Sequence, residues 1–419
     1  MKCLSHILFY MLFAAAGLML SCGCRDSGAD WTAGFASARI TPDTPQWLAG
    51  YDRREKSLGV HDDIWCKVAA FSNGRDTVVI AANDVIGLFR DDVEEIRQAV
   101  DISNRCRDRI FITCTHNHSG PDLLGLWNAD RSKSGVDPAY LSYVKHVIAR
   151  TVEKALASLQ SADLLLASTE VEGISYNGRD REITDNSVVV LQARTADRVI
   201  GTLVNFACHP EVLTGGNNLI TSDYAHYMYR GLESASGGVA MLVNGALGGM
   251  LTPLVSEHSF AEAERCGTVL ADAVLSALEH PTRMASADLM CRIKEMRLTL
   301  ENPGFERLYR AGIVRREFQG NTVLTEVGIV RLGDLTAVSI PGEALPKIGL
   351  RLKERMSTPF KMVFGLANDE LGYLIPGEDW RADAYEESMS VAGDAGDRIE
   401  AALVELIDGS SGGTGSSMQ

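Results

Sequence analysis

The sequence lacks the features that would point to several large classes of protein. It contains no run of basic residues, and 40 lysines and arginines stand against 55 aspartates and glutamates, a formal net charge of -15 at pH 7. This charge argues against nucleic acid and against an anionic membrane surface as partners. No Cys-x-x-Cys pair occurs, so a structural zinc site held by cysteines is not expected.

Linkers and internal repeats are missing as well. No sequence period recurs, and no Pro-, Gly- or Ser-rich stretch interrupts residues 32–408. The chain is 46% hydrophobic and 23% charged, which is ordinary globular composition with enough length for a large core. We therefore expect a single α/β domain over residues 32–408, built on a mixed β-sheet with flanking helices.

The first 22 residues differ from the rest of the chain. Lys2 precedes an apolar run from Ile7 to Leu20, which is followed by Ser21-Cys22. This pattern is typical of a secretory signal with a lipoprotein cleavage site, and the run is short for a membrane span. We expect an exported protein anchored to the cell envelope by acylated Cys22, on the periplasmic or extracellular face, with residues 23–31 as a tether. An uncleaved membrane anchor is the alternative.

The remaining cysteines and the C-terminal end show no pattern that indicates a functional site. Six cysteines lie far apart, mostly in apolar runs: Cys66, Cys106, Cys114, Cys208, Cys266 and Cys291. We expect most of them to be small buried hydrophobic residues, and their spacing leaves open whether any two form a disulfide. Residues 409–419 are almost all Gly, Ser and Thr, so we expect a loose tail there.

Apolar, strand-like runs alternate with amphipathic helical stretches between these ends. Strands are expected at residues 34–40, 77–85, 109–115, 164–173, 187–193, 199–207, 239–244, 322–332, 335–340 and 362–366. Helices are expected to begin near residues 91, 138, 224, 259 and 344. The long helix starting at Asp137-Pro138 is the clearest, because an N-cap carboxylate and a first-turn proline precede a continuous apolar stripe.

Polar residues suited to metal binding follow several of these strands. The strand ending near Thr115 runs into His116-Asn117-His118 and a Ser-Gly-Pro turn. In an extended chain, residues i and i+2 point to the same side, which would let both imidazoles face one site. His209, Glu343 and Tyr373 also follow strands, and open α/β sheets bind ligands outside the carboxyl ends of their strands.

Two histidines and one carboxylate form a known catalytic zinc set that leaves a position open for water. Taken singly, each residue has a plainer explanation. A strand-end histidine commonly bonds to backbone, Glu343 would suit the start of a helix, and a tyrosine would suit the core or its rim.

Five motifs, in order along the chain, resemble those of the neutral/alkaline ceramidases. They are Thr115-His116-Asn117-His118-Ser119-Gly120-Pro121, Asn205-Phe206-Ala207-Cys208-His209-Pro210, Leu251-Thr252-Pro253, Pro341-Gly342-Glu343 and Gly372-Tyr373. The resemblance spans residues 34–396, the catalytic domain of that family, without its immunoglobulin-like C-terminal domain. It implies a zinc amidohydrolase that splits an N-acyl sphingoid amide by metal-activated water.

The resemblance also implies roles for individual residues. The zinc ligands would be His116, His209, Glu343 and Tyr373. The groups facing the substrate would be His118, Tyr385, Thr252 in place of the family's serine, and Arg179. His118 is the candidate proton donor to the leaving amine, and Tyr385 or His118 would stabilise the oxyanion.

Departures from the family pattern keep two other functions open. Glu211 follows His209-Pro210 where the family usually has a small polar residue, which favours a zinc-dependent esterase or deacylase acting on a polar acylated substrate such as a sugar. Met250 and the glycines around it instead favour a non-catalytic surface binding protein. A pocket lined by aliphatic side chains would support the lipid substrate, and one lined by acids and tryptophan the polar substrate.

Overall fold

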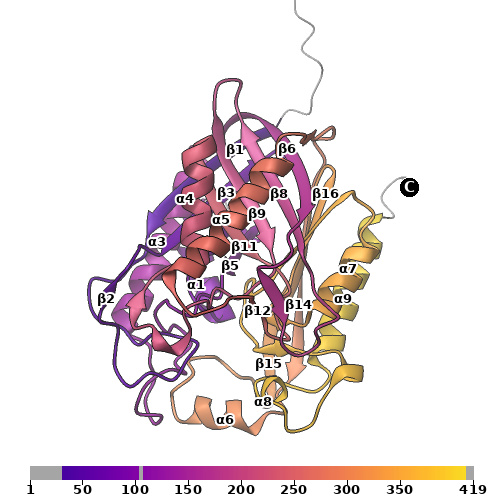
Figure 1. Cartoon of the computed structure of the whole chain (residues 1–419). Helices are drawn as coiled ribbons and strands as arrows, with labels where there is room; N and C mark the ends of the chain where they lie inside the picture. The colour runs from indigo at the N-terminus through magenta and orange to yellow at the C-terminus, as the bar shows by residue number, and fades with distance from the viewer. Residues whose placement is uncertain (1–30, 103–106, 412–419) are drawn as a thin grey trace, which may run out of the picture.

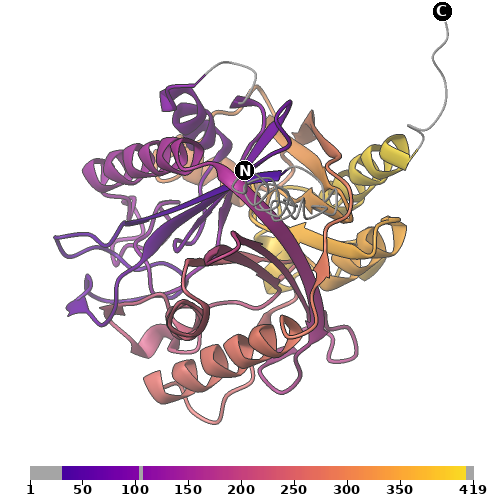
Figure 2. The same cartoon turned by 90° about the horizontal axis from the view of Figure 1, so that it is seen from above.

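The computed structural model describes residues 31–102 and 107–411. The predicted signal, the anchor at Cys22 and Cys106 lie outside these residues. Two β-sheets pack face to face and helices cover both outer faces, which makes four layers (Figures 1 and 2). The expected α/β architecture with a mixed sheet and flanking helices is confirmed, and the structure adds a second sheet that the sequence did not predict.

The larger sheet has the strand order β11-β9-β8-β6-β1-β3-β4-β5, with β13 paired to β6. Its strands are β1 Trp31–Arg39, β3 Trp65–Ser72, β4 Thr77–Asn83, β5 Ile110–Cys114, β6 Gln160–Glu170, β8 Ser187–Arg194, β9 Val199–Phe206, β11 Val239–Asn244 and β13 Thr282–Arg283. Neighbours pair antiparallel except β4 with β5 and β9 with β11. Both faces are covered, so β4, β5 and β9 are almost continuous apolar runs with no alternation.

The smaller sheet has the order β14-β15-β16-β18. Its strands are β14 Leu289–Thr299, β15 Thr322–Leu332, β16 Leu335–Ser339 and β18 Phe360–Phe364. Buried side chains from both sheets, among them Phe71, Phe111 and Phe364, form one apolar core between them. The expectation of a single sheet missed this arrangement because β14 is half-exposed and rich in charge, a pattern with weak periodicity.

The helices lie on the two outer faces. Against the larger sheet pack α1 Arg90–Ala99, α3 Pro138–Ala157, α4 Tyr224–Ser236 and α5 Phe260–Ala277. Against the smaller sheet pack α7 Pro346–Arg355 and α9 Ala395–Ser411. As predicted, the Asp137 carboxylate accepts the Ala139 and Tyr140 amides at the start of α3.

The structure adds detail to two expectations, the loose C-terminal tail and the state of the cysteines. Helix α9 runs to Ser411, so residues 409–411 of the predicted tail are helical. It was missed in the sequence, as was α6 Pro303–Arg310. The five cysteines in the described part of the chain are free, and four of them are buried. Within residues 31–102 and 107–411, no helix is both long and apolar enough to cross a membrane.

The ends of β5, β9 and β11 are tied together by one buried side chain. The Asn244 amide, at the end of β11, donates from Nδ2 to the carbonyls of Thr115 at 2.7 Å and Cys208 at 2.8 Å. Its Oδ1 accepts the amides of Cys208 at 3.1 Å and Gly245 at 3.0 Å. The residues that follow Thr115 and Cys208 are His116 and His209, so this asparagine sets the spacing of the two histidine segments.

Candidate metal centre

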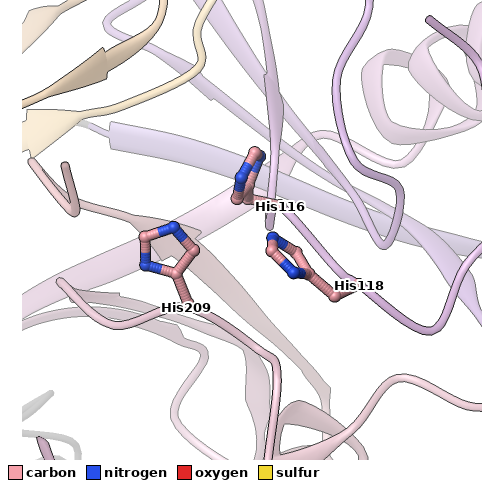
Figure 3. A group of neighbouring side chains, drawn as sticks. All are labelled: His116, His118 and His209. Carbon is pink, nitrogen blue, oxygen red and sulfur yellow. The ribbon is translucent and has the colours of Figure 1, made fainter. Parts of the chain in front are cut away.

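Three buried histidines face one another below the strand ends. One ring nitrogen from each of His116, His118 and His209 lies within 4.8 Å of the other two (Figure 3). The ring centroids are 4.8 to 5.4 Å apart and the rings are steeply inclined to each other. His209 is fully buried, and the other two are at most 8% exposed.

The two histidines of His116-Asn117-His118 meet for a different reason from the one predicted. Strand β5 ends at Cys114 and His116 has φ of 65°, so the pair lies in a turn and not in extended chain. A non-glycine residue in this left-handed region is strained, and such strain tends to persist where a site requires it.

The outer ring nitrogens of two histidines are occupied by backbone carbonyls. His116 Nδ1 lies 2.7 Å from the Ile86 carbonyl oxygen, and His209 Nδ1 lies 2.8 Å from that of Leu251. A carbonyl oxygen only accepts, so Nδ1 carries a proton in both rings, and Nε2 of each ring is the atom left to bind a second proton or a metal ion. Backbone partners of this kind orient histidines that ligate metals.

Both Nε2 atoms point at the same carboxylate. Glu343 Oε2 lies 3.2 Å from His209 Nε2 and 3.4 Å from His116 Nε2. Two ring nitrogens and a carboxylate that converge in a buried space need a positive charge between them, which a proton on a ring or a bound cation supplies. Burial alone would lower the pKa of His209, but the Glu211 and Glu343 carboxylates raise it to about 9, so the site attracts positive charge. These residues fit a metal ion.

Tyr373 lies beside this set. The parallel pairing of β17 Glu343–Ala344 with β19 Tyr373–Leu374 places it opposite Glu343. The side chain is 5% exposed and its hydroxyl lies 3.4 Å from Met250 Sδ. Of the four predicted ligands, the structure therefore brings three into direct contact and places the fourth next to the carboxylate.

His118 has a different environment from the other two histidines. Its Nδ1 lies 3.1 Å from Glu211 Oε2, yet neither ring nitrogen has a hydrogen-bond partner of normal geometry. The Tyr51 hydroxyl donates to the same Glu211 oxygen at 2.5 Å. Burial lowers the pKa of His118 to about 4 in spite of this carboxylate. A neutral ring whose Nε2 has no partner is available to a ligand.

Glu211 and Gly50 are residues of the site whose roles the sequence did not reveal. Glu211 was noted only as a departure from the family pattern, two residues after His209. Gly50 packs on the His118 ring: a Cβ there would lie 2.3 Å from its Cγ, and φ is 86°. Only glycine fits both conditions, and no sequence pattern distinguishes this glycine from others.

A pocket opens beside the three histidines. Its volume is about 580 Å³, which includes the solvent-filled space at its mouth. Half of the sixteen lining residues are aliphatic, aromatic or methionine: Ile86, Phe89, Leu124, Leu126, Trp127, Phe305, Val314 and Met389. The polar lining residues are His116, His118, Glu343, Glu370, Tyr373 and Tyr385. Tyr385 is 63% exposed and its ring centroid lies 6.0 Å from that of Tyr373.

Arg179 and Thr252 are not among the residues that line this pocket. The Arg179 guanidinium pairs with Glu386 and, at 2.6 Å, with Glu387, both in α8 Tyr385–Ser388. It therefore holds the helix that carries Tyr385. Thr252 lies in β12 Leu251–Pro253, opposite Tyr176 in β7 Ser175–Asn177, in the segment whose Leu251 carbonyl orients His209.

Replacing Arg179 with methionine should destabilise the protein by about 3 kcal/mol, because two carboxylates with little exposure lose their cation. Urea unfolding followed by intrinsic tryptophan fluorescence would measure this loss. Arg181, exposed and two residues away, is the matched control, and Arg181→Met should leave the transition within about 0.5 kcal/mol. An unchanged transition in R179M would show that the ion pairs do not hold α8.

No protein-family model matches the chain. Among curated proteins it is 22% identical over 218 residues to the neutral ceramidase of Mycobacterium tuberculosis, an alignment that covers 46% of this chain and 34% of that protein. The crystal structure of neutral ceramidase from Pseudomonas aeruginosa superposes with a TM-score of 0.78 at 17% identity, covering 90% of this chain and 74% of that one. The chain resembles one neutral ceramidase in sequence and another in fold.

A second solved structure, described as a ceramidase complexed with C2, gives a TM-score of 0.75 at 17% identity and the same coverage. At this identity the structural likeness to the neutral ceramidases concerns the fold. The chain spans about a third of the length of the curated ceramidase that it matches.

Proposed function

We propose that this chain is a zinc-dependent amidohydrolase, related to the neutral ceramidases, that cleaves an N-acyl amide with a ceramide-like substrate. The observation that carries the proposal is the convergence of His116, His209 and Glu343 beside a pocket with many apolar lining residues, which His116 and Glu343 themselves line. The ligand set is that of catalytic zinc sites, and the aliphatic and aromatic lining residues suit an acyl chain.

The proposed zinc ligands are His116, His209 and Glu343, with Tyr373 beside them. Bound zinc would act as a Lewis acid and would lower the pKa of a bound water to about 7. His118, at the pocket wall, can accept or give a proton at its unoccupied nitrogen, while Glu211 engages the other side of the ring. The Tyr385 hydroxyl, at the exposed end of the pocket, is suited to donate to the substrate carbonyl.

A second candidate is a zinc-dependent esterase or deacylase acting on a polar acylated substrate such as a sugar. Two lining residues favour it, the Glu370 carboxyl and the Trp127 indole, since buried carboxyls and aromatic faces suit hydroxylated ligands. Export and anchoring through acylated Cys22 also remain proposals, supported by the leader sequence. Mass spectrometry of the mature N-terminus tests the anchor.

A hydrolysis screen tests the function. The zinc-loaded protein without residues 1–24 would be offered N-acyl sphingoid amides and acylated sugars, with release of fatty acid as the measurement. We expect amide cleavage that chelation abolishes and added zinc restores. Cleavage of sugar esters alone would favour the second candidate, and hydrolysis of neither would indicate a binding protein.

Glu211→Ala should lower kcat about ten- to a hundredfold with little change in zinc content, a loss typical of outer residues that orient a histidine. The His118 ring would lose its buried carboxylate partner, and the Tyr51 hydroxyl would lose its acceptor. Steady-state kinetics and zinc analysis of one preparation would measure both effects. Glu172→Ala, at an exposed site, is the control. An E211A enzyme with unchanged kcat would contradict the orienting role.

A further inference from the structure

One carboxyl in the pocket has no assigned role. Glu370 is 6% exposed and lines the pocket with its neighbour Gly372. Its Oε1 accepts the Gly372 amide at 2.9 Å, but its Oε2 is buried without any hydrogen-bond partner. Buried polar atoms are nearly always paired, and an unpaired one calls for an explanation such as a ligand.

The Arg316 guanidinium pairs with Asp369 and not with this carboxyl. The Arg316 guanidinium forms a two-pronged pair with Asp369, with one contact at 2.6 Å, and also donates to the Leu324 carbonyl. Asp369 further accepts the Thr325 hydroxyl at 2.7 Å. Burial, reinforced by the Glu343 carboxylate, raises the pKa of Glu370 well above its usual range. Its Oε2 is therefore left to pair with a ligand.

The carboxyl lies close to the proposed metal ligands. Gly87 packs on it so closely that a Cβ there would lie 3.0 Å from Glu370 Cγ and 3.3 Å from Oε2. Gly87 follows Ile86, whose carbonyl holds His116, and Gly372 precedes Tyr373. A ligand that fills the apolar part of the pocket and reaches the metal centre therefore passes near a hydrogen-bonding group.

We propose that Glu370 is a specificity residue whose carboxyl hydrogen-bonds a hydroxyl group of the substrate next to the scissile amide. This inference rests on the proposed amidase function and assigns to Glu370 the recognition of a hydroxyl that such a substrate carries. Sphingoid bases and amino sugars both carry such a hydroxyl, whereas simple N-alkyl amides do not. A site built to pair a hydroxyl discriminates strongly against the analogue that lacks it, because its own polar group is then left unpaired.

The test compares an N-acyl ethanolamine with the N-ethyl amide of the same fatty acid. Calorimetry on chelator-treated protein measures their binding without turnover. We expect the native protein to bind the hydroxylated amide at least about tenfold more tightly. Glu370→Gln, nearly isosteric and able to donate and accept, should keep most of this preference, and Glu370→Leu should reduce it to within about twofold.

Phe305→Leu is the matched control, since it changes an apolar lining residue and should weaken both amides alike. An undiminished preference in E370L, equal affinities in the native protein, or binding of neither amide would overturn the inference. Hydrolysis of the two amides by zinc-loaded native protein tests the amidase proposal separately. If the protein binds them with the expected preference but cleaves neither, the amidase proposal is wrong and the role of Glu370 in binding still holds.

Discussion

Replacing His209 with alanine should remove both the bound metal and the hydrolytic activity. The ring is fully buried, and its Nε2 points at Glu343 Oε2 from 3.2 Å while its Nδ1 is engaged by the Leu251 carbonyl. Without it, one of three converging ligands is lost. We expect zinc affinity to fall more than about a hundredfold, beyond the loss seen for outer residues, and turnover to fall about a thousandfold.

Zinc content and hydrolysis measured on the same preparation would show this result. His116→Ala should behave like H209A, whereas His118→Ala should keep the metal and lose turnover, because the Nε2 atoms of only His116 and His209 pair with Glu343. His280→Ala, at an exposed site, is the control. Full zinc content in H209A would refute the site, and equal zinc loss in H118A would make His118 a third imidazole ligand.

Asn244→Leu should cost about 4 kcal/mol of folding free energy. The substitution conserves volume but removes two donors and the acceptor shared by two amides, in a residue with no exposure. Each buried group left unpaired costs about 1 to 3 kcal/mol. The two histidine segments would also lose their common tie, so we expect weaker zinc binding in whatever protein folds.

Urea unfolding of chelator-treated protein measures this cost without the stabilisation that a bound metal adds. Asn321→Leu, at an exposed position, is the matched control and should shift the free energy of unfolding by about 0.5 kcal/mol or less. A transition in N244L that coincides with that of the native protein would mean that the strand ends hold together without the asparagine.

Much of the local structure could be predicted because its causes lie within a few residues. The Asp137-Pro138 cap starts α3, and β15 and β11 have the predicted bounds because their apolar runs are bordered by turn residues or glycine. The histidine motif and its position after a strand were evident for the same reason. Strand β14 was missed because it is half-exposed and rich in charge. Buried and exposed side chains do not alternate clearly along it, so its sequence lacks the two-residue hydrophobic period that indicates a strand.

The amino-acid sequence alone thus determined the α/β class, most helix and strand positions, and which histidines, carboxylate and tyrosine belong to one site. Only the tertiary structure decided that two sheets enclose the core, that Arg179 holds α8 and lies outside the pocket, and that Glu370 is left without a partner inside it. These outcomes depend on pairs such as Arg179 with Glu387, separated by more than two hundred residues. Such pairs form only when distant segments have folded against each other, and no local pattern of residues encodes the distance between them.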